Sequence, residues 1–128
     1  MRQAFRLVTI AGLFLLLSTF SGCNPVGDAM NQAQQAAGSA SMQADLGKLA
    51  EMYHMHHDAN GQGPAGWDEL IAFTEKMNKP TEPIARVREA GYNVKWGVKF
   101  STLTEGMTNT VMAEKAGGPT LMFDGAVR

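Results

Sequence analysis

The chain lacks several features on which large classes of protein depend. Cys23 is the only cysteine in 128 residues, so no disulfide can form within the chain and its fold must rest on an apolar core. The sequence contains neither the Gly-x-Ser-x-Gly elbow of hydrolases nor a glycine-rich phosphate loop. Ser41 and Ser101 have no visible partner that could activate a hydroxyl. We therefore expect neither an enzyme nor a bound cofactor.

Basic residues are also few and scattered. The chain holds 11 Lys and Arg against 12 Asp and Glu, and its basic residues form no run. A nucleic-acid partner requires a basic stripe, so the composition argues against one. The absence of a basic run also argues against electrostatic attachment to an anionic membrane surface.

The apolar run near the start is short for a membrane-spanning helix. It covers residues 7–20, about fourteen residues where a transmembrane helix needs about twenty. Arg2 and Arg6 precede it, and the small pair Ser21-Gly22 follows it. A basic start, a short apolar run and a small-residue cleavage site are typical of a secretory signal peptide. We assign residues 1–22 to such a signal.

Cys23 comes directly after the small pair. This arrangement resembles the lipobox of bacterial lipoproteins, and the resemblance implies that Cys23 receives a lipid and becomes the mature N-terminus. Phe20 stands where the consensus lipobox has Leu. An ordinary signal peptide with an incidental cysteine is the alternative. Attachment to the membrane would come from the lipid, because no basic cluster supports it.

These features predict a location in the cell envelope. Removal of residues 1–22 would leave nine Lys and Arg with twelve Asp and Glu, in an acidic chain long enough for one small domain. Asn24 stands where some bacteria place Asp to retain lipoproteins in the inner membrane. We therefore expect a lipid anchor in the outer rather than the inner membrane, with the domain facing the periplasm or the exterior.

The segment at residues 23–40 is polar and rich in small side chains. Such a stretch buries too little surface to offset the entropy of ordering it, so we expect a lipidated N-terminus followed by a flexible tether. Its Ala and Gln content would also permit a frayed helix. Residues 41–128 then form the single domain.

A long helix is expected at the start of that domain. Apolar side chains and one histidine recur at spacings of three and four, namely Met42, Leu46, Leu49, Ala50, Tyr53 and His57. Ser41 suits the N-cap, and Asn60-Gly61 suits the end of the helix. A shorter helix beginning at Trp67 and one or two helical turns over residues 84–89 should follow.

Beyond Gly91 the period of the apolar residues changes to two, which predicts strands. The expected strands are residues 92–96, 110–114 and 120–123. Asp124-Gly125 is a strong hairpin signal that leads into a fourth strand at residues 126–128. Helices followed by such strands predict an α+β fold, with a long N-terminal amphipathic helix packed on a small antiparallel sheet.

Three segments of the domain resemble one bacterial family. They are Asp45–Leu49 with Tyr53-His54 and His57–Gly61, then Glu105–Val111, then Gly117-Gly118 with Phe123–Arg128. In this order they are similar to the first helix, the strand entry and the closing turn of pilin-like secreted proteins with a C-terminal domain of unknown function, which are related in fold to type II secretion pseudopilins. The resemblance covers residues 43–128. It implies a helix packed on an antiparallel sheet and no biochemical activity.

Two departures from that family bear on function. Its members start with a prepilin methylation signal and a long apolar helix that assembles into filaments, whereas this chain starts with a lipoprotein-like signal and a polar segment. Lys115 stands near the place where the family has a histidine ahead of its paired glycines. Neither filament assembly nor the role of that histidine is carried over to this chain.

A histidine-rich cluster at residues 52–58 is the one place that suggests metal binding. His54 pairs with His57 or Asp58 at helical spacing, which would offer two ligands to Zn²⁺ or Cu²⁺. A complete site needs more ligands, and no second group of His or Cys is present to supply them. We expect instead that His57 is half-buried in the core face and that the other histidines are solvated near the helix C-terminus.

Met52, Met55 and His56 form a second group on the same helix. Thioether and imidazole groups suit Cu(I), so periplasmic handling of copper or zinc is the alternative function. Met52 and Met55 also fall outside the predicted core face, which suggests a surface for contact with a protein partner.

The sequence therefore predicts a membrane-anchored, non-catalytic bacterial lipoprotein that serves as an interaction or structural module of the cell envelope. An envelope protein is the candidate partner, and the sequence identifies no small-molecule ligand.

Overall fold

A computed structural model describes residues 25–128, with side chains from Ala29 onward. Its helices are α1 (Pro25–Asn60), α2 (Trp67–Lys76), α3 (Glu82–Glu89) and the short 3₁₀ helix η1 (Phe100–Thr102), and its strands are β1 (Asn93–Val94), β2 (Val111–Glu114) and β3 (Leu121–Met122). The predicted α+β class, a long N-terminal helix with a small antiparallel sheet, is confirmed. The predicted signal peptide at residues 1–22 and the predicted lipid attachment at Cys23 lie outside the described residues.

The chain divides into two compact units, residues 1–34 and residues 35–128. In the first unit the structure describes a helical stretch whose side chains from Ala29 to Gln34 are exposed. The second unit contains the rest of α1, the shorter helices and the sheet. Within residues 25–128, no helix has an apolar stretch long enough to span a lipid bilayer.

α1 begins at Pro25, well before the start expected at Ser41. Residues 25–40 are therefore helical, as in the alternative to the expected flexible tether, and the side chains of residues 29–40 are all exposed. Ala and Gln are good helix formers, and no proline follows Pro25 before the helix ends at Asn60. The helix thus continues upstream of its packed part on local propensity, and the role of this segment as a tether stays a prediction.

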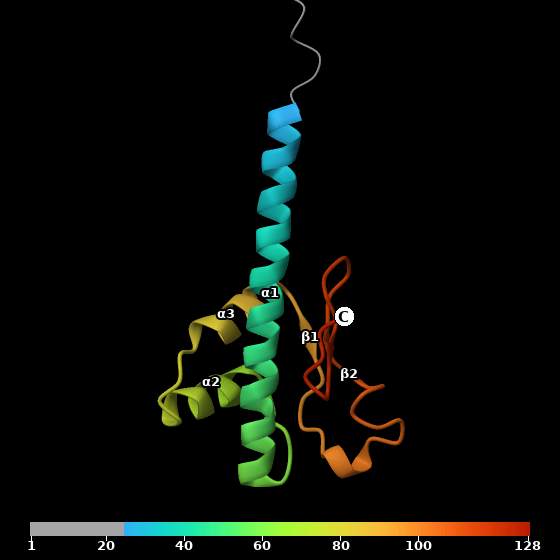
Figure 1. The fold of residues 1–128 in the computed structure, drawn as a ribbon. Coiled ribbons are helices and arrows are strands. Elements are labelled where there is room, and N and C mark those ends of the chain that lie inside the picture. Colours follow the sequence, from blue (N-terminus) through green and yellow to red (C-terminus); the bar gives the residue numbers. More distant parts are fainter. Residues whose placement is uncertain (1–24) are drawn as a thin grey trace, which may run out of the picture. The chain divides into compact units, whose positions relative to one another are not determined.

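In the second unit, the buried face of α1 is wider than predicted. Leu46, Leu49, Ala50 and Tyr53 are buried as expected, and Met52 and His56 are buried against expectation. Figure 1 shows the reason: α2 and α3 lie on one side of this part of α1, and the strands lie on the other. Because neighbours cover two flanks of the helix, its buried residues extend beyond a single stripe.

α3 is attached to α1 by an ion pair. Arg86 of α3 donates hydrogen bonds of 2.8 and 2.7 Å to the two carboxylate oxygens of Asp45 in α1. The hydrogen bond to Asp45 raises the pKa of the Arg86 guanidinium and keeps it charged. Below this pair the apolar side chains of Ile84 and Val87 are buried in the core together with Leu70 of α2.

The three strands form one antiparallel sheet in the order β1-β2-β3. β1 pairs with β2 through Asn93 opposite Glu114 and Val94 opposite Ala113, and β2 pairs with β3 through Val111 opposite Met122 and Ala113 opposite Leu121. The register shifts between Val111 and Ala113, which leaves Met112 as an extra residue on β2. Met112 and Ala113 are both fully buried.

The strand predicted at residues 92–96 keeps its alternation of burial but changes its pairing partner. Tyr92 is buried, Val94 and Trp96 are half-buried, and the intervening Asn93 and Lys95 are exposed. The chain leaves β2 after Lys95 and pairs with the loop before α2: the Gly97 N–H donates to the carbonyl of Pro64 at 2.8 Å, and Gly63 N–H donates to Val98 at 2.9 Å. The extended segment is therefore longer than the two residues of β1.

The predicted hairpin turn at Asp124-Gly125 is confirmed. Gly125 has φ 87°, in the left-handed region that favours glycine. The predicted fourth strand is reduced to one bridge between Leu121 and Val127, flanked by two backbone hydrogen bonds that Thr120 and Arg128 exchange at 2.7 and 2.8 Å.

Candidate functional site

Three histidines near the end of α1 contact three different parts of the fold. His54 is half-buried, and its Nε2 lies 2.6 Å from the carbonyl oxygen of Phe123. A carbonyl oxygen only accepts hydrogen bonds, so this nitrogen carries the proton and donates. The bond joins α1 to the turn that follows β3.

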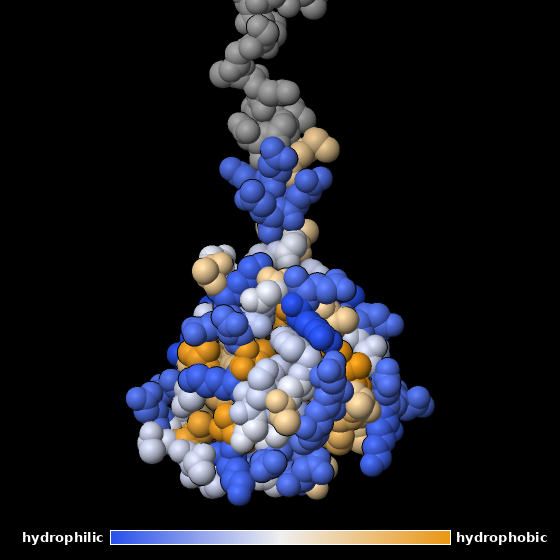
Figure 2. All heavy atoms as spheres, turned by 180° about the vertical axis from the view of Figure 1, so that it is seen from behind, coloured by the Kyte–Doolittle hydropathy of each residue, from blue (hydrophilic) through white to orange (hydrophobic). Residues whose placement is uncertain are grey.

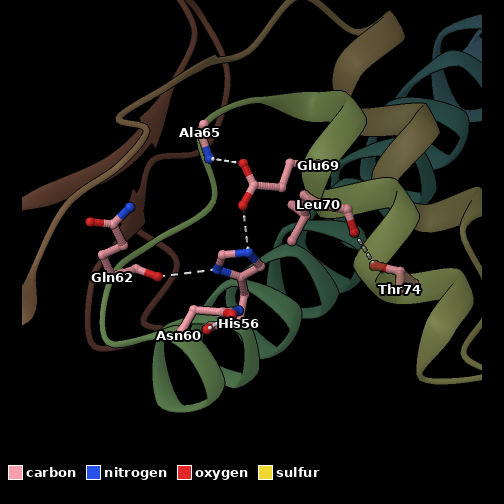
Figure 3. A network of polar contacts seen from close by, with 7 residues as sticks. All are labelled: His56, Asn60, Gln62, Ala65, Glu69, Leu70 and Thr74. Carbon is pink, nitrogen blue, oxygen red and sulfur yellow. Dashed lines mark hydrogen bonds and ion pairs between the residues drawn. The ribbon is translucent and has the colours of Figure 1, made fainter.

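His56 is 4% exposed and lies between α1 and the start of α2 (Figure 3). Its Nε2 is 2.9 Å from Glu69 Oε1, and its Nδ1 is 3.1 Å from the carbonyl oxygen of Gln62. Glu69 Oε2 also accepts the backbone N–H of Ala65 at 2.9 Å. This carboxylate therefore joins the last turns of α1 to the first turn of α2, where a negative charge also complements the helix dipole.

His57 stacks on the ring of Phe100, with centroids 3.7 Å apart and an interplanar angle of 3°. Its Nε2 accepts the backbone N–H of Phe100 at 3.2 Å. An accepting nitrogen carries no proton, so the ring is neutral with its proton on Nδ1, which lies 3.9 Å from Asp58 Oδ1. The half-buried position expected for His57 is confirmed.

The hydrogen bonds of the three rings lead to different partners, although the rings of His54 and His57 both pack against Phe100. Among the side chains that the structure describes, no group of three or more His, Cys, Asp or Glu is arranged to hold a metal ion. The expectation that His54 and His56 are solvated is wrong, because the closing turn covers His54 and the start of α2 covers His56. The geometry of the cluster therefore indicates internal contacts that hold the domain together.

The contact surface predicted for Met52 and Met55 also loses its basis. Met52 is 3% exposed and belongs to the core, and Met55 is half-buried and packs against it. The prediction placed both on a free flank of α1, but that helix is covered on two sides. Met52 therefore offers no exposed apolar area that a partner could bury, and Met55 is only partly exposed.

The three segments that carry the family resemblance meet at the closing turn. Besides the bond from His54, the Phe123 N–H donates to the carbonyl oxygen of Thr110 at 3.0 Å, and the Asp124 N–H donates to that of Met107 at 3.2 Å. Segments far apart in the sequence are thus joined at Phe123, whose side chain is fully buried. The closing turn is a junction of the fold.

The Tyr53 hydroxyl is a further junction, which the sequence analysis identified only as a core position. It donates to the carbonyl oxygen of Lys95 at 2.7 Å and accepts the N–H of Val98 at 3.3 Å. Burial raises the pKa of this phenol, and the hydrogen bond from Val98 opposes the shift. No local sequence pattern predicts this contact, because the two backbone groups belong to an extended segment more than forty residues away from Tyr53.

The role of Glu69 was not predicted, although the sequence contains a signal for it. Glu69 is three residues after Gly66, the N-cap of α2, and an acidic residue at this position commonly accepts backbone N–H groups at the start of a helix. Its second contact, with His56, depends on how α1 and α2 pack.

No family model matches this chain, and no curated protein or solved structure matches it either. The similarity to pilin-like secreted proteins therefore stays a prediction, and so do the functions that it implies.

Proposed function

We propose that this protein is a lipid-anchored, non-catalytic lipoprotein of the bacterial cell envelope that acts as an interaction or structural module. One observation carries the proposal: a basic start and a short apolar run are followed by Ser21-Gly22 directly before the only cysteine, Cys23. A single acyl chain binds membranes only marginally. Stable anchoring through Cys23 therefore requires at least two acyl chains.

The internal bonding of the domain supports a structural role. Within the described part of the chain, no buried side-chain nitrogen or oxygen lacks a hydrogen-bond partner. Buried polar groups without partners are a frequent mark of catalytic and ligand sites. Here Asp45 is bonded to Arg86 and His56 is bonded to Glu69, so the buried carboxylate and the buried imidazole are both used to join helices.

The surface of the domain supports a domain that faces an aqueous compartment while the lipid holds the chain at the membrane. On the face shown in Figure 2, apolar side chains lie in separate groups among polar ones. Among the described residues, Met30 and Met77 are the large apolar side chains that are exposed. A permanent partner would require a larger continuous apolar area, so contacts with an envelope partner should be transient.

The experiment that tests the anchor is the intact mass of the protein extracted from membranes, compared with that of Cys23→Ala. We expect residues 23–128 plus at least two acyl chains for the natural chain. The variant should lose both the added mass and its membrane attachment. An unlipidated mass, or a cleavage elsewhere, would remove the basis of the proposal and favour a freely secreted protein.

The membrane can be identified with the variant Asn24→Asp. In separated envelope fractions we expect the natural chain with the outer membrane and the variant with the inner membrane. The natural chain in the inner membrane would contradict this part of the proposal and leave the lipid anchor intact.

A further inference from the structure

The contact between His57 and η1 depends on a neutral imidazole ring. His57 Nε2 accepts the N–H of Phe100, which begins η1, at 3.2 Å. A protonated imidazole has a hydrogen on both nitrogens and can only donate. After protonation, two N–H groups would face each other at this contact, and neither would have an acceptor.

The other two histidines of α1 do not share this dependence. Both nitrogens of His56 face acceptors, the Gln62 carbonyl and the Glu69 carboxylate, so protonation provides a donor for each. His54 donates from Nε2 to Phe123, and its ring also lies 4.9 Å from that of Phe100, centroid to centroid. A proton added at Nδ1 leaves the bond to Phe123 in place, and a cation beside the Phe100 ring is favourable. Acid therefore weakens one of the three contacts and spares the others.

We propose that His57 is a pH-dependent latch, which holds η1 against α1 when the ring is neutral and releases η1 when the ring is protonated. Release therefore belongs to acidic conditions, under which the ring carries a second proton. α2 and the closing turn should stay attached, because the contacts of His56 and His54 persist. This inference rests on the described domain and is independent of the lipid anchor.

The charged groups near His57 do not restore the contact in acid. Asp58, on α1 itself, is the one carboxylate within 4.0 Å of the ring among the described residues, and its side chain is 82% exposed. Its attraction for the charged ring is screened by solvent. From the side of η1, Lys99 is exposed and lies in no ion pair within the described part of the chain. Neither group supplies an acceptor for the hydrogen on Nε2.

The stacked ring of Phe100 has a similar, limited effect. An aromatic face attracts a cation, so the parallel stack favours the protonated form of His57. It also provides no acceptor for the backbone N–H of Phe100, which loses its bond. The contact is half-buried, and two N–H groups left facing each other there outweigh a modest attraction between ring faces.

Release of η1 would uncover part of the aromatic core. The ring of Phe100 lies against Tyr53 and Phe123, at centroid distances of 6.2 and 5.9 Å. When Phe100 moves away, the faces of these two rings become accessible. The acidic form of the domain would therefore expose an apolar surface that the neutral form covers.

The latch can be tested by amide hydrogen exchange in the full chain in detergent micelles, with each rate corrected for the intrinsic effect of pH. Between about pH 7.5 and 5.5, we expect the protection of the Phe100 amide to fall about tenfold, within the roughly hundredfold limit that one linked proton sets over two pH units. The Ala65 amide, which is bonded to Glu69, is the internal reference and should change less than about twofold. Constant protection of Phe100 over this range would overturn the proposal.

The matched variant is His57→Gln, whose amide oxygen can accept the Phe100 N–H but does not titrate. We expect its Phe100 protection to be independent of pH, whereas His54→Gln should retain the natural dependence. An unchanged pH dependence in His57→Gln would also overturn the proposal.

If His57→Gln does not fold, nitrogen NMR of the His57 imidazole in the natural chain tests the latch instead. The proton should be on Nδ1 near neutral pH, and the loss of Phe100 protection should follow protonation of Nε2. A proton on Nε2 at neutral pH would refute the latch.

Discussion

At the scale of single residues, the Tyr53 hydroxyl lies where α1, the extended segment after β1 and the loop before α2 come together. It bonds to the backbone of Lys95 and Val98, and Gly63 packs directly against its ring. A fully buried aromatic residue that also satisfies two backbone groups is costly to disturb. Gly63 is therefore required because no larger side chain fits beside the Tyr53 ring.

We predict that Gly63→Ala destabilises the domain by about 1–3 kcal/mol, because the added Cβ would overlap with the hydroxyl and ring of Tyr53. Urea unfolding measures the change. The control is Gly47→Ala, where a Cβ meets nothing within 4 Å. Inside a helix this change should stabilise by about 0.5–1 kcal/mol. Equal effects of the two substitutions would contradict the packing at Tyr53.

The two tyrosines should make the free energy of unfolding depend on pH in the alkaline range. Burial raises the pKa of both Tyr53 and Tyr92 above the ordinary value of 10.0, and the chain has no other tyrosine. The unfolded chain therefore releases these protons at lower pH than the folded chain. The stability contributed by the neutral phenols is complete below about pH 10 and is lost as pH rises through the folded pKa values.

Titration of the phenolate absorbance, followed together with circular dichroism, tests this expectation. Both tyrosines should ionise together with unfolding, and Tyr53→Phe should reduce the loss of stability above about pH 10. Ionisation near pH 10 with a native dichroism spectrum would show that the phenols are accessible.

At the scale of elements, the contact between α1 and α2 depends on the carboxylate of Glu69. Glu69→Ala leaves Nε2 of the buried His56 and the N–H of Ala65 without their acceptor, and we expect a loss of about 1–3 kcal/mol. Asp68→Ala is the matched control, because it removes another negative charge from the first turn of α2. Its side chain is 94% exposed, in a surface pair with Arg88. The control should cost less than about 1 kcal/mol in the same urea experiment.

If Asp68→Ala lost as much unfolding free energy as Glu69→Ala, the negative charge at the start of α2 alone would account for the effect. The contact with His56 would then contribute nothing of its own.

Local sequence patterns predicted most of these elements. Helical spacing of Leu46, Leu49 and Tyr53 identified the packed part of α1, and Gly61, with φ 76°, follows directly after its end. Alternation identified the extended segment after Gly91, and the strand at Val111–Glu114 lies within the strand expected at residues 110–114. Such patterns record which side chains are buried, and that information is local.

The differences arise where one element meets another. Nothing local to residues 92–96 shows that this segment leaves β2 and pairs with Gly63 and Pro64. The burial of Met52 and His56 likewise depends on neighbours on two flanks of α1. The candidate site was therefore predicted as a cluster on one helix, whereas the partners of its rings come from α2, η1 and the closing turn.

At the scale of the whole molecule, the packed domain should not depend on the exposed start of α1. The side chains of residues 29–40 are exposed, so their removal costs no burial. We predict that chains beginning at Gln35 and at Ser41 differ in unfolding free energy by less than about 0.5 kcal/mol. The control is a chain beginning at Leu49, which lacks Asp45 and should not fold cooperatively.

A marked loss of stability on shortening from Gln35 to Ser41 would contradict this prediction. It would place part of the stability of the domain in the exposed helix.

The contacts of α1 are distributed along its length and lead to separate elements. Asp45 leads to α3, Tyr53 to the extended segment after β1, His54 to the closing turn and His56 to α2. Tension applied along this helix would load all of these bonds side by side, and no one of them would carry the whole force. A domain pulled by α1 should therefore resist mechanical extension as a unit and give way in one step, and it should not be peeled apart element by element.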